Sequence, residues 1–263
     1  MKFTDEDISY ITGEKFSDYY HLRLYGNQPI SRRDCILKHT MGKKVLHIGC
    51  CDHLPVIAKK IETKTWLHGL LLDNCSFVAG IDINLNAIEY IRTSYNIDNV
   101  FCVDITDSMP EELQSTIFDF AVLGDVVEHV NNPVEFLLNI KKNIKKNVRK
   151  IIITVPNALR FYGKSSNIQN IMNMFRGFSK EMINSDHRYW FTPYTIAKVC
   201  FEAGLYPEEL LFCDNEVKLR YIIAKKLRII KYDINIDDVT KKYSSSRWSF
   251  SSQDLLLICS LDR

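Results

Sequence analysis

The sequence predicts an α/β fold built on a seven-stranded, mostly parallel sheet with helices on both of its faces. Seven short apolar runs rich in Val, Ile and Phe each end at polar residues, as strands buried on both faces do. Helical patterns separate many of these runs, and such alternation favours parallel strands. The apolar runs cover residues 43–49, 76–83, 99–105, 118–125, 150–157, 209–215 and 254–261.

The last two runs differ from the others in how they are connected. The sequence shows no clear crossover helix between 209–215 and 254–261. A parallel pair of strands needs a crossover connection, whereas an antiparallel pair does not. We therefore expect the final strand to run antiparallel to the rest of the sheet.

Three helices are indicated by their ends and by their apolar faces. Asn84 is a typical N-cap for a helix over 84–95 whose apolar side chains share one side. A proline in the first turn and lysines in the last turn delimit a helix over 133–146. A Thr-Pro pair begins the third helix, 192–203, and Gly204 follows its end. These segments supply the helical layers of the predicted fold.

Three regions lie outside this alternation. Residues 1–42 are predicted to form an N-terminal helical cap on a main domain that spans 43–263. An insertion at 157–191 leaves from the carboxyl edge of the sheet, where such folds bind ligands, so we predict a substrate lid. The alternative is a segment that only covers the core. A second insertion, 216–253, contains the basic amphipathic run KLRYIIAKKLRIIK (218–231). That run can contact an anionic membrane surface or guide an anionic substrate, or it is an ordinary surface helix.

The composition limits the classes of function. The 263 residues include 34 basic and 32 acidic side chains, a net charge of +2, so we do not expect a nucleic-acid partner. The N-terminus lacks the apolar segment of a signal peptide, and no apolar run approaches the roughly 18 residues that span a bilayer. We therefore expect a cytoplasmic protein. The eight cysteines are scattered without a CxxC pair, which argues against a zinc ribbon or a disulfide framework.

Four successive strands are predicted to end in residues suited to one ligand. They end at Gly49, at Asp82, at Asp104 and at Gly124-Asp125. A glycine permits a tight turn, and an acid at the end of the second strand can accept hydrogen bonds from a ribose diol. Because the carboxyl ends of parallel strands meet at one edge, these residues should converge on a single crevice.

The segments that carry these residues resemble class I S-adenosylmethionine-dependent methyltransferases, most closely the ubiquinone-biosynthesis type and its small-molecule relatives. The likeness covers about 43–215 and rests on VLHIGCCDH, GIDIN, CVDITD, FDFAVLGDVVEHVNNPVEFL and IIITVPN. It implies a Rossmann-like fold, S-adenosylmethionine as cofactor and S-adenosylhomocysteine as its product. In that family the successive strand ends hold the methionine end, the ribose, the adenine and the reactive side of the cofactor. The cofactor-binding residues implied by position are Gly49, Cys50, Cys51, Asp82, Ile83, Asp104, Ile105, Gly124 and Val126.

The first loop departs from the family pattern Asp-x-Gly-x-Gly-x-Gly. His47 stands in place of the acid, and Cys51 and His53 replace two glycines. Cys51 is small, so the backbone can still approach a ligand closely. The spacing from Gly49 to the acid of the second strand is longer than the roughly 20 residues of a dinucleotide fingerprint. The missing glycines and this spacing argue against a nicotinamide enzyme.

An alcohol that accepts a methyl group must also lose its proton, and a histidine or a carboxylate can remove it. Asp125, His129 and His187 are the predicted catalytic residues near the strand edge, with Glu128 as a further candidate base. Capping and packing are the alternative roles of the histidines. The set Asp125-x-x-Glu128-His129 with His187 also resembles the metal ligands of some relatives, including a small-RNA terminal methyltransferase. We predict the ordinary motif without a metal.

These observations predict O-methylation of a small polar metabolite that is sugar-like or anionic. A sugar, a nucleotide-sugar or a surface-polysaccharide precursor is the expected substrate class. The alternatives are a non-catalytic, methyltransferase-like binding subunit and a metal-assisted methyltransferase of RNA ends. The N-terminal region is dense in side chains that could close over a cofactor or substrate, and the sequence does not choose among them. These side chains are Tyr19, Tyr20, Arg23, Tyr25, Arg32 and Arg33.

Overall fold

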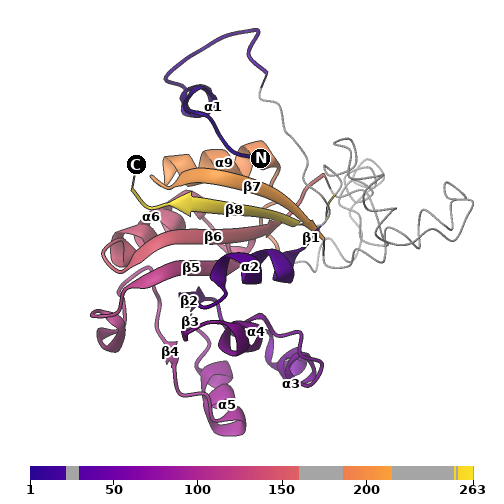
Figure 1. Ribbon diagram of the computed structural model, residues 1–263, viewed down its shortest axis with the longest axis vertical. Coiled ribbons are helices and arrows are strands. Elements are labelled where there is room, and N and C mark those ends of the chain that lie inside the picture. Colours follow the sequence, from indigo (N-terminus) through magenta and orange to yellow (C-terminus); the bar gives the residue numbers. More distant parts are fainter. Residues whose placement is uncertain (22–29, 160–185, 215–251, 253, 263) are drawn as a thin grey trace, which may run out of the picture.

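The computed structural model describes residues 1–21, 30–159, 186–214, 252 and 254–262. They contain one eight-stranded sheet of order β1-β7-β8-β6-β5-β2-β3-β4 (Figure 1). The strands are β1 (Ile30–Ser31), β2 (Lys44–Ile48), β3 (Phe77–Asp82), β4 (Val100–Cys102), β5 (Phe118–Gly124), β6 (Val148–Pro156), β7 (Tyr206–Asp214) and β8 (Asp254–Ser260). All seven predicted strands are present, and β8 runs antiparallel to both β6 and β7, as the lack of a clear crossover helix predicted.

The prediction of seven strands was one too few. The additional strand, β1, is only two residues long and pairs in parallel with Cys213 and Asp214 at the end of β7. Two residues carry no periodic pattern, so the sequence contained no signal for this strand. The N-terminal region that contains it also forms α1 (Asp5–Ile11) and α2 (Arg32–Thr40).

The three predicted helices are present as α5 (Leu85–Tyr95), α6 (Pro133–Ile144) and α9 (Pro193–Glu202). Each begins after a polar N-cap whose side-chain oxygen accepts a hydrogen bond from the backbone N–H three residues later. Two further helices, α3 (Leu54–Glu62) and α4 (Leu67–Asn74), lie between β2 and β3. They account for the long spacing between the first two strand ends.

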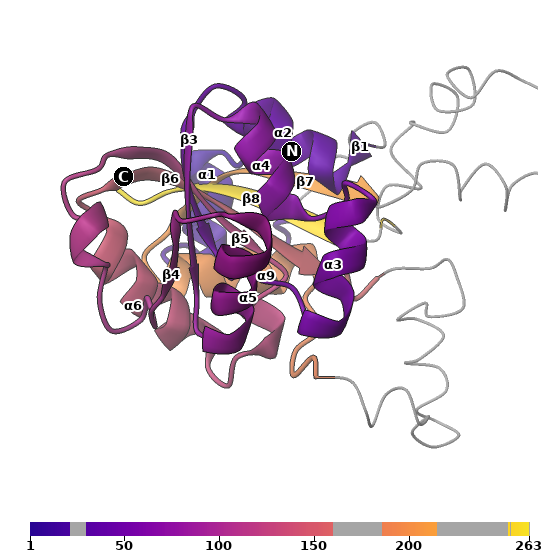
Figure 2. The same ribbon diagram turned by 90° about the horizontal axis from the view of Figure 1, so that it is seen from below.

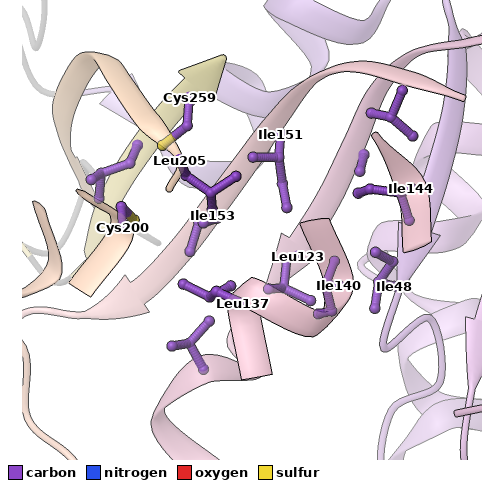
Figure 3. Packing of buried hydrophobic residues seen from close by; sticks show 14 of the residues in the cluster. Ile48, Leu123, Leu137, Ile140, Ile144, Ile151, Ile153, Cys200, Leu205 and Cys259 are labelled. Carbon is purple, nitrogen blue, oxygen red and sulfur yellow. The ribbon is translucent and has the colours of Figure 1, made fainter. Parts of the chain in front are cut away.

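Helices cover both faces of the sheet (Figure 2). Ile36 of α2 and Leu71 of α4 are fully buried in the cluster on one face. On the other face, α6 and α9 pack against the central strands. Figure 3 shows Leu137, Ile140 and Ile144 of α6 beside apolar side chains of the sheet. The central strands are therefore buried on both faces, which explains why their sequences are continuously apolar.

The topology creates a crevice beside β2. This strand pairs in parallel with β3 on one side and with β5 on the other, so the strand order reverses there. In open α/β sheets, ligands bind outside the carboxyl ends of the strands at such a switch point. The 3-10 turns η1 (Glu111–Leu113) and η2 (Val127–His129) follow β4 and β5.

The ends of the first insertion meet at this carboxyl edge, where Asn157 forms a bridge with Phe191. The predicted lid falls mainly on 160–185, and the predicted basic helix falls on 218–231. Both ranges lie outside the described residues, so these functions stay predictions. Among the residues that are described, no helix is long and apolar enough to cross a membrane.

Candidate active site

A cavity of about 850 Å³ opens at the carboxyl ends of β2, β3 and β5. Side chains from the start of α3, from η2 and from the segment before α9 complete its wall. The cavity lies at the switch point of the sheet, as expected for a ligand site. All twelve predicted site residues line it: Gly49, Cys50, Cys51, Asp82, Ile83, Asp104, Ile105, Gly124, Asp125, Val126, His129 and His187.

The turn after β2 begins with a glycine that no other residue could replace without strain. Gly49 has a φ of 72°, a conformation that L side chains rarely adopt. Its N–H donates a hydrogen bond of 2.8 Å to the carbonyl of Ile81. A Cβ atom at Gly49 would lie 2.6 Å from Cγ2 of Val126. The turn therefore approaches Val126 so closely that only a bare backbone fits.

The carboxylate of Asp82 is held by two backbone groups at the end of β3. The N–H of Cys51 donates to Oδ2 at 2.9 Å, and the N–H of Asn84 donates to Oδ1 at 3.0 Å. A carboxylate oxygen can accept more than one hydrogen bond, so both oxygens can still bind a diol. The side chain is thus oriented before any ligand arrives.

Two further residues extend this wall. Ile83 is 74% exposed and offers an apolar surface beside Asp82. Asp104 accepts hydrogen bonds at Oδ1 from the N–H and the hydroxyl of Thr106, at 2.9 and 2.7 Å. Its other oxygen, Oδ2, has no hydrogen bond to a described residue. Asp104 can therefore accept a hydrogen bond from a ligand without giving up its present contacts.

The helical insertion between β2 and β3 supports the loop from behind. The indole N–H of Trp66 donates to the carbonyl of Cys50 at 3.0 Å, and Nδ1 of His68 lies 3.2 Å from Nδ1 of His47. Gly80 makes room for this packing, because a Cβ there would lie 2.7 Å from Sγ of Cys50 and 2.8 Å from Cε1 of His68. The insertion is therefore part of the site and not only a spacer.

The two buried histidines form an uncharged pair. Burial lowers the pKa of His68 to about 4, and burial together with the neighbouring His68 lowers the pKa of His47 well below its ordinary value. Both rings are consequently neutral at pH 7, and one Nδ1 donates while the other accepts. A neutral pair thus occupies the position where the family loop has an acid.

An arginine from the N-terminal region reaches the same cavity. Arg32 forms an ion pair with Asp125 and donates to the hydroxyl of Thr154 at 3.4 Å, and that hydroxyl donates to Oδ1 of Asp125 at 3.0 Å. The Nε atom of Arg32 also lies 3.8 Å from Oδ2 of Asp254. The carboxylate of Asp125 is engaged on both oxygens. Arg32 is the predicted N-terminal side chain that lines the cavity within the described residues.

Two histidines face each other in another part of the cavity lining. The rings of His129 and His187 meet edge to face, with centroids 4.7 Å apart. The segment that carries His187 is docked on η2, because the N–H of Arg188 donates to the carbonyl of Glu128 at 2.7 Å. The hydroxyl of Tyr189 strengthens the docking through a 2.7 Å bond to a neighbouring carbonyl. Burial and the neighbouring His129 lower the pKa of His187.

Glu128 lies behind these rings. Its side chain is fully buried, and neither carboxyl oxygen has a hydrogen bond to a described residue. Burial raises its pKa to about 7. Oε1 lies 3.9 Å from Nε2 of His129. One possible ligand atom from each of Glu128, His129 and His187 lies within 4.8 Å of the others, an arrangement that could hold a metal ion.

A comparison with protein-family models assigns the chain to a family. Residues 32–210, more than half of the chain, match the model of a methyltransferase domain. The chain belongs to the class I S-adenosylmethionine-dependent methyltransferases. The family match begins at the first residue of α2, so it includes Arg32 as well as the strands from β2 to β6. No curated protein matches the chain.

Several solved structures are similar in outline to this methyltransferase. An S-adenosylmethionine-dependent methyltransferase from Archaeoglobus fulgidus is 18% identical, with a TM-score of 0.48, and the match covers 87% of this chain and 91% of that one. The N-methyltransferase NodS from Bradyrhizobium japonicum, solved with S-adenosylhomocysteine, is 13% identical, with a TM-score of 0.44 and coverage of 87% and 85%. The small RNA methyltransferase HEN1 is 13% identical, with a TM-score of 0.49, and the match covers 93% of this chain and 27% of that one.

The cavity of this methyltransferase fits S-adenosylmethionine. The glycine turn packs tightly against Val126 at the edge of the cavity, and Asp82 presents a pre-oriented carboxylate. Ile83 offers an exposed apolar surface, and Asp104 uses only one carboxylate oxygen in its contacts with Thr106. Both features suit adenine, which is flat and donates hydrogen bonds. These are the groups that a nucleoside attached to an amino acid requires, and the altered cysteine loop does not remove them.

Sequence reasoning missed several residues of the site. Trp66 and His68 lie in an insertion whose helices were not predicted. Thr154 lies within the apolar run 150–157, which was interpreted only as a buried strand. Asp186 lies 3.3 Å from Nδ1 of His129 and 3.9 Å from Nε2 of His53. Its position next to His187 in the chain was the only available signal.

Proposed function

We propose that this methyltransferase transfers a methyl group to an oxygen atom of a small polar metabolite. The observation that carries the proposal is the pair His129 and His187, which lines the same cavity as Gly49 and Asp82. One group of lining residues, the first wall, would hold the cofactor, and a second group, the second wall, has side chains that can move a proton.

The residues of the first wall would bind the cofactor. Asp82 would accept hydrogen bonds from the ribose, Ile83 would contact the adenine, and Asp104 would accept from its amino group. The turn from Gly49 to Cys51 would hold the methionine end. S-adenosylmethionine supplies a methyl group on a sulfonium, which is already a good leaving group, so the protein mainly has to align the reactants.

On the second wall, His187 is our candidate for the general base. Its lowered pKa keeps the ring neutral at pH 7, so it can take the proton of a hydroxyl acceptor. His129 holds the ring of His187 edge to face. Asp125, whose carboxylate is engaged by Arg32 and Thr154, would position the end of β5 and take no proton.

The character of the second wall supports a sugar-like acceptor. His53, Asp186 and Arg188 line the cavity together with the catalytic pair. These side chains donate and accept hydrogen bonds, as a substrate with several hydroxyl groups requires. A sugar, a nucleotide-linked sugar or a precursor of a surface polysaccharide is therefore the preferred class.

Replacing the proposed base tests this function. The variant His187→Gln should lower kcat with a hydroxyl acceptor by about 10²–10⁴-fold, while the affinity for S-adenosylhomocysteine stays unchanged. Turnover can be followed as product formed from labelled cofactor against a panel of sugars and nucleotide-sugars. His21→Gln, a change at an exposed histidine outside the cavity lining, is the matched control. Full activity of His187→Gln would contradict the proposed role.

A metal-assisted reaction is the second candidate, supported by the compact set Glu128, His129 and His187. Histidine and carboxylate groups are fitting ligands for Zn²⁺ or Mg²⁺. Such a metal would act as a Lewis acid on the acceptor oxygen and would replace the base. Metal analysis of purified protein, followed by assays after chelation, separates the two candidates. Unchanged turnover of metal-free protein would exclude this second candidate.

A further inference from the structure

Two adjacent cysteines in the first loop point into the same space. Sγ of Cys50 and Sγ of Cys51 are 3.9 Å apart, and both residues line the cavity. Neighbouring residues in an extended strand point to opposite sides, so this arrangement depends on the turn that starts at Gly49. One carboxylate oxygen of Asp82 lies with the two sulfur atoms, all three within 4.8 Å of one another.

The sulfur separation matches a known coordination geometry. Two thiolates bound to a tetrahedral Zn²⁺ at about 2.3 Å each are about 3.8 Å apart, close to the 3.9 Å found here. A carboxylate is a suitable third ligand, and water can occupy the fourth position on the cavity side. Hydrogen bonds also orient the three ligands, because Trp66 donates to the carbonyl of Cys50 and the N–H of Cys51 donates to Asp82.

We propose that Cys50, Cys51 and Asp82 form a binding site for a thiophilic divalent cation of the Zn²⁺ type within the cofactor loop. On binding, the two thiols release their protons to solvent, and the cation forms two metal–sulfur bonds and one metal–oxygen bond. The two thiolates and the carboxylate then more than offset the charge of the cation. Because both thiols must release their protons, the affinity for the cation should increase with pH.

Cation and cofactor would compete for this loop. Asp82 cannot bind a cation and also accept hydrogen bonds from a ribose in the same orientation. The cation would therefore inhibit the enzyme, and bound cofactor would protect it. This competition rests on the proposed role of Asp82, whereas the cation site rests only on the geometry of the three side chains.

A Cd²⁺ titration of the full-length protein tests the site. With a non-thiol reductant present, one equivalent of Cd²⁺ should produce a thiolate-to-metal absorption band, and Zn²⁺ should abolish it by displacement. Cys51→Ser and Asp82→Asn should each weaken binding at least about tenfold. Cys102→Ser removes an exposed thiol outside the cavity lining and should change nothing. The set Glu128, His129 and His187 contains no sulfur, so it cannot produce the band.

The outcomes separate the cation site from the proposed function. No band, or an unchanged band in a folded Cys51→Ser variant, overturns the cation site, and thermal melting checks that the variant is folded. A second titration follows saturation with S-adenosylhomocysteine, which should suppress the band. If that ligand binds and the band persists at full strength, the shared use of Asp82 is wrong. If that ligand does not bind to metal-free protein, the proposed function fails and the cation site stands.

Discussion

The two walls of the cavity are built in different ways. The cofactor wall, from Gly49 to Cys51 with Asp82, is shaped by backbone hydrogen bonds and by a turn packed against Val126. The acceptor wall, with Glu128, His129 and His187, consists of titratable side chains docked on one another. On the proposed function, packing shapes the part that would recognise the cofactor, and the protonation of side chains would govern the part that handles the acceptor.

The strongest test of the cofactor wall is Gly49→Ala. Positive φ at a non-glycine residue costs about 1–3 kcal/mol, and the contact with Val126 adds an overpacking cost of similar size. We expect the affinity for S-adenosylhomocysteine to fall about hundredfold or more by calorimetry. Gly42→Ala is a matched control, because Gly42 has a φ of 69° but nothing within 4 Å of its added Cβ. Equal losses in both variants would show that backbone strain, and not the close approach to Val126, governs binding.

The buried histidine pair should make stability fall in acid. The pKa of His68 is lowered to about 4 from an ordinary 6.5, so the unfolded chain binds a proton more readily than the folded one. The contribution of His68 is therefore present above pH 6.5 and decreases as the pH falls towards 4, by about 3 kcal/mol. Denaturant unfolding of wild type and His68→Gln across this range measures the effect. A wild-type curve parallel to that of the variant would contradict the neutral pair.

Glu128, in the acceptor wall, should make the free energy of unfolding decrease as the pH rises, which is the opposite of the effect of His68. Its pKa is raised from 4.5 to about 7, so the folded state binds the proton more tightly than the unfolded chain does. The stabilising contribution of the protonated carboxyl is complete below pH 4.5 and is lost as the pH rises through 7. Glu128→Gln should match wild type near pH 4.5 and be more stable by about 3 kcal/mol at pH 8. A variant less stable than wild type at pH 8 would show that ionised Glu128 has a stabilising partner.

The smallest expected effect concerns the support behind the cofactor loop. Trp66→Phe keeps most of the buried ring but removes the hydrogen bond to the carbonyl of Cys50. We expect a loss of about 1 kcal/mol in the free energy of unfolding and a modest increase in the KM for the cofactor. Thermal melting and steady-state kinetics measure both. A change in kcat alone would argue that the insertion acts on the acceptor wall instead.

Local patterns were sufficient to predict the strand ends and their residues. Gly49, Asp82, Asp104 and Asp125 each follow an apolar run, and parallel strands bring such ends together whatever the side-chain detail. The three capped helices were predictable for a similar reason, because their N-caps act on backbone groups only three residues away.

Contacts between distant parts of the chain could not be predicted in this way. Choosing Arg32 among the N-terminal arginines and tyrosines requires knowing that α2 lies beside the end of β5. The pairing of His47 with His68 depends on an insertion whose helices have no N-cap side-chain hydrogen bond to mark their starts. β1 forms only because Ile30 and Ser31 meet the end of β7.

The central claim is that the two walls divide binding and chemistry between them. Calorimetric titration of S-adenosylhomocysteine into wild type, Asp82→Ala and His187→Gln tests it most directly. The account predicts equal affinity for wild type and His187→Gln, and an affinity at least about tenfold lower for Asp82→Ala, which loses hydrogen bonds to a charged group. Equal binding by wild type and Asp82→Ala, or a loss in His187→Gln as large as that in Asp82→Ala, would contradict it.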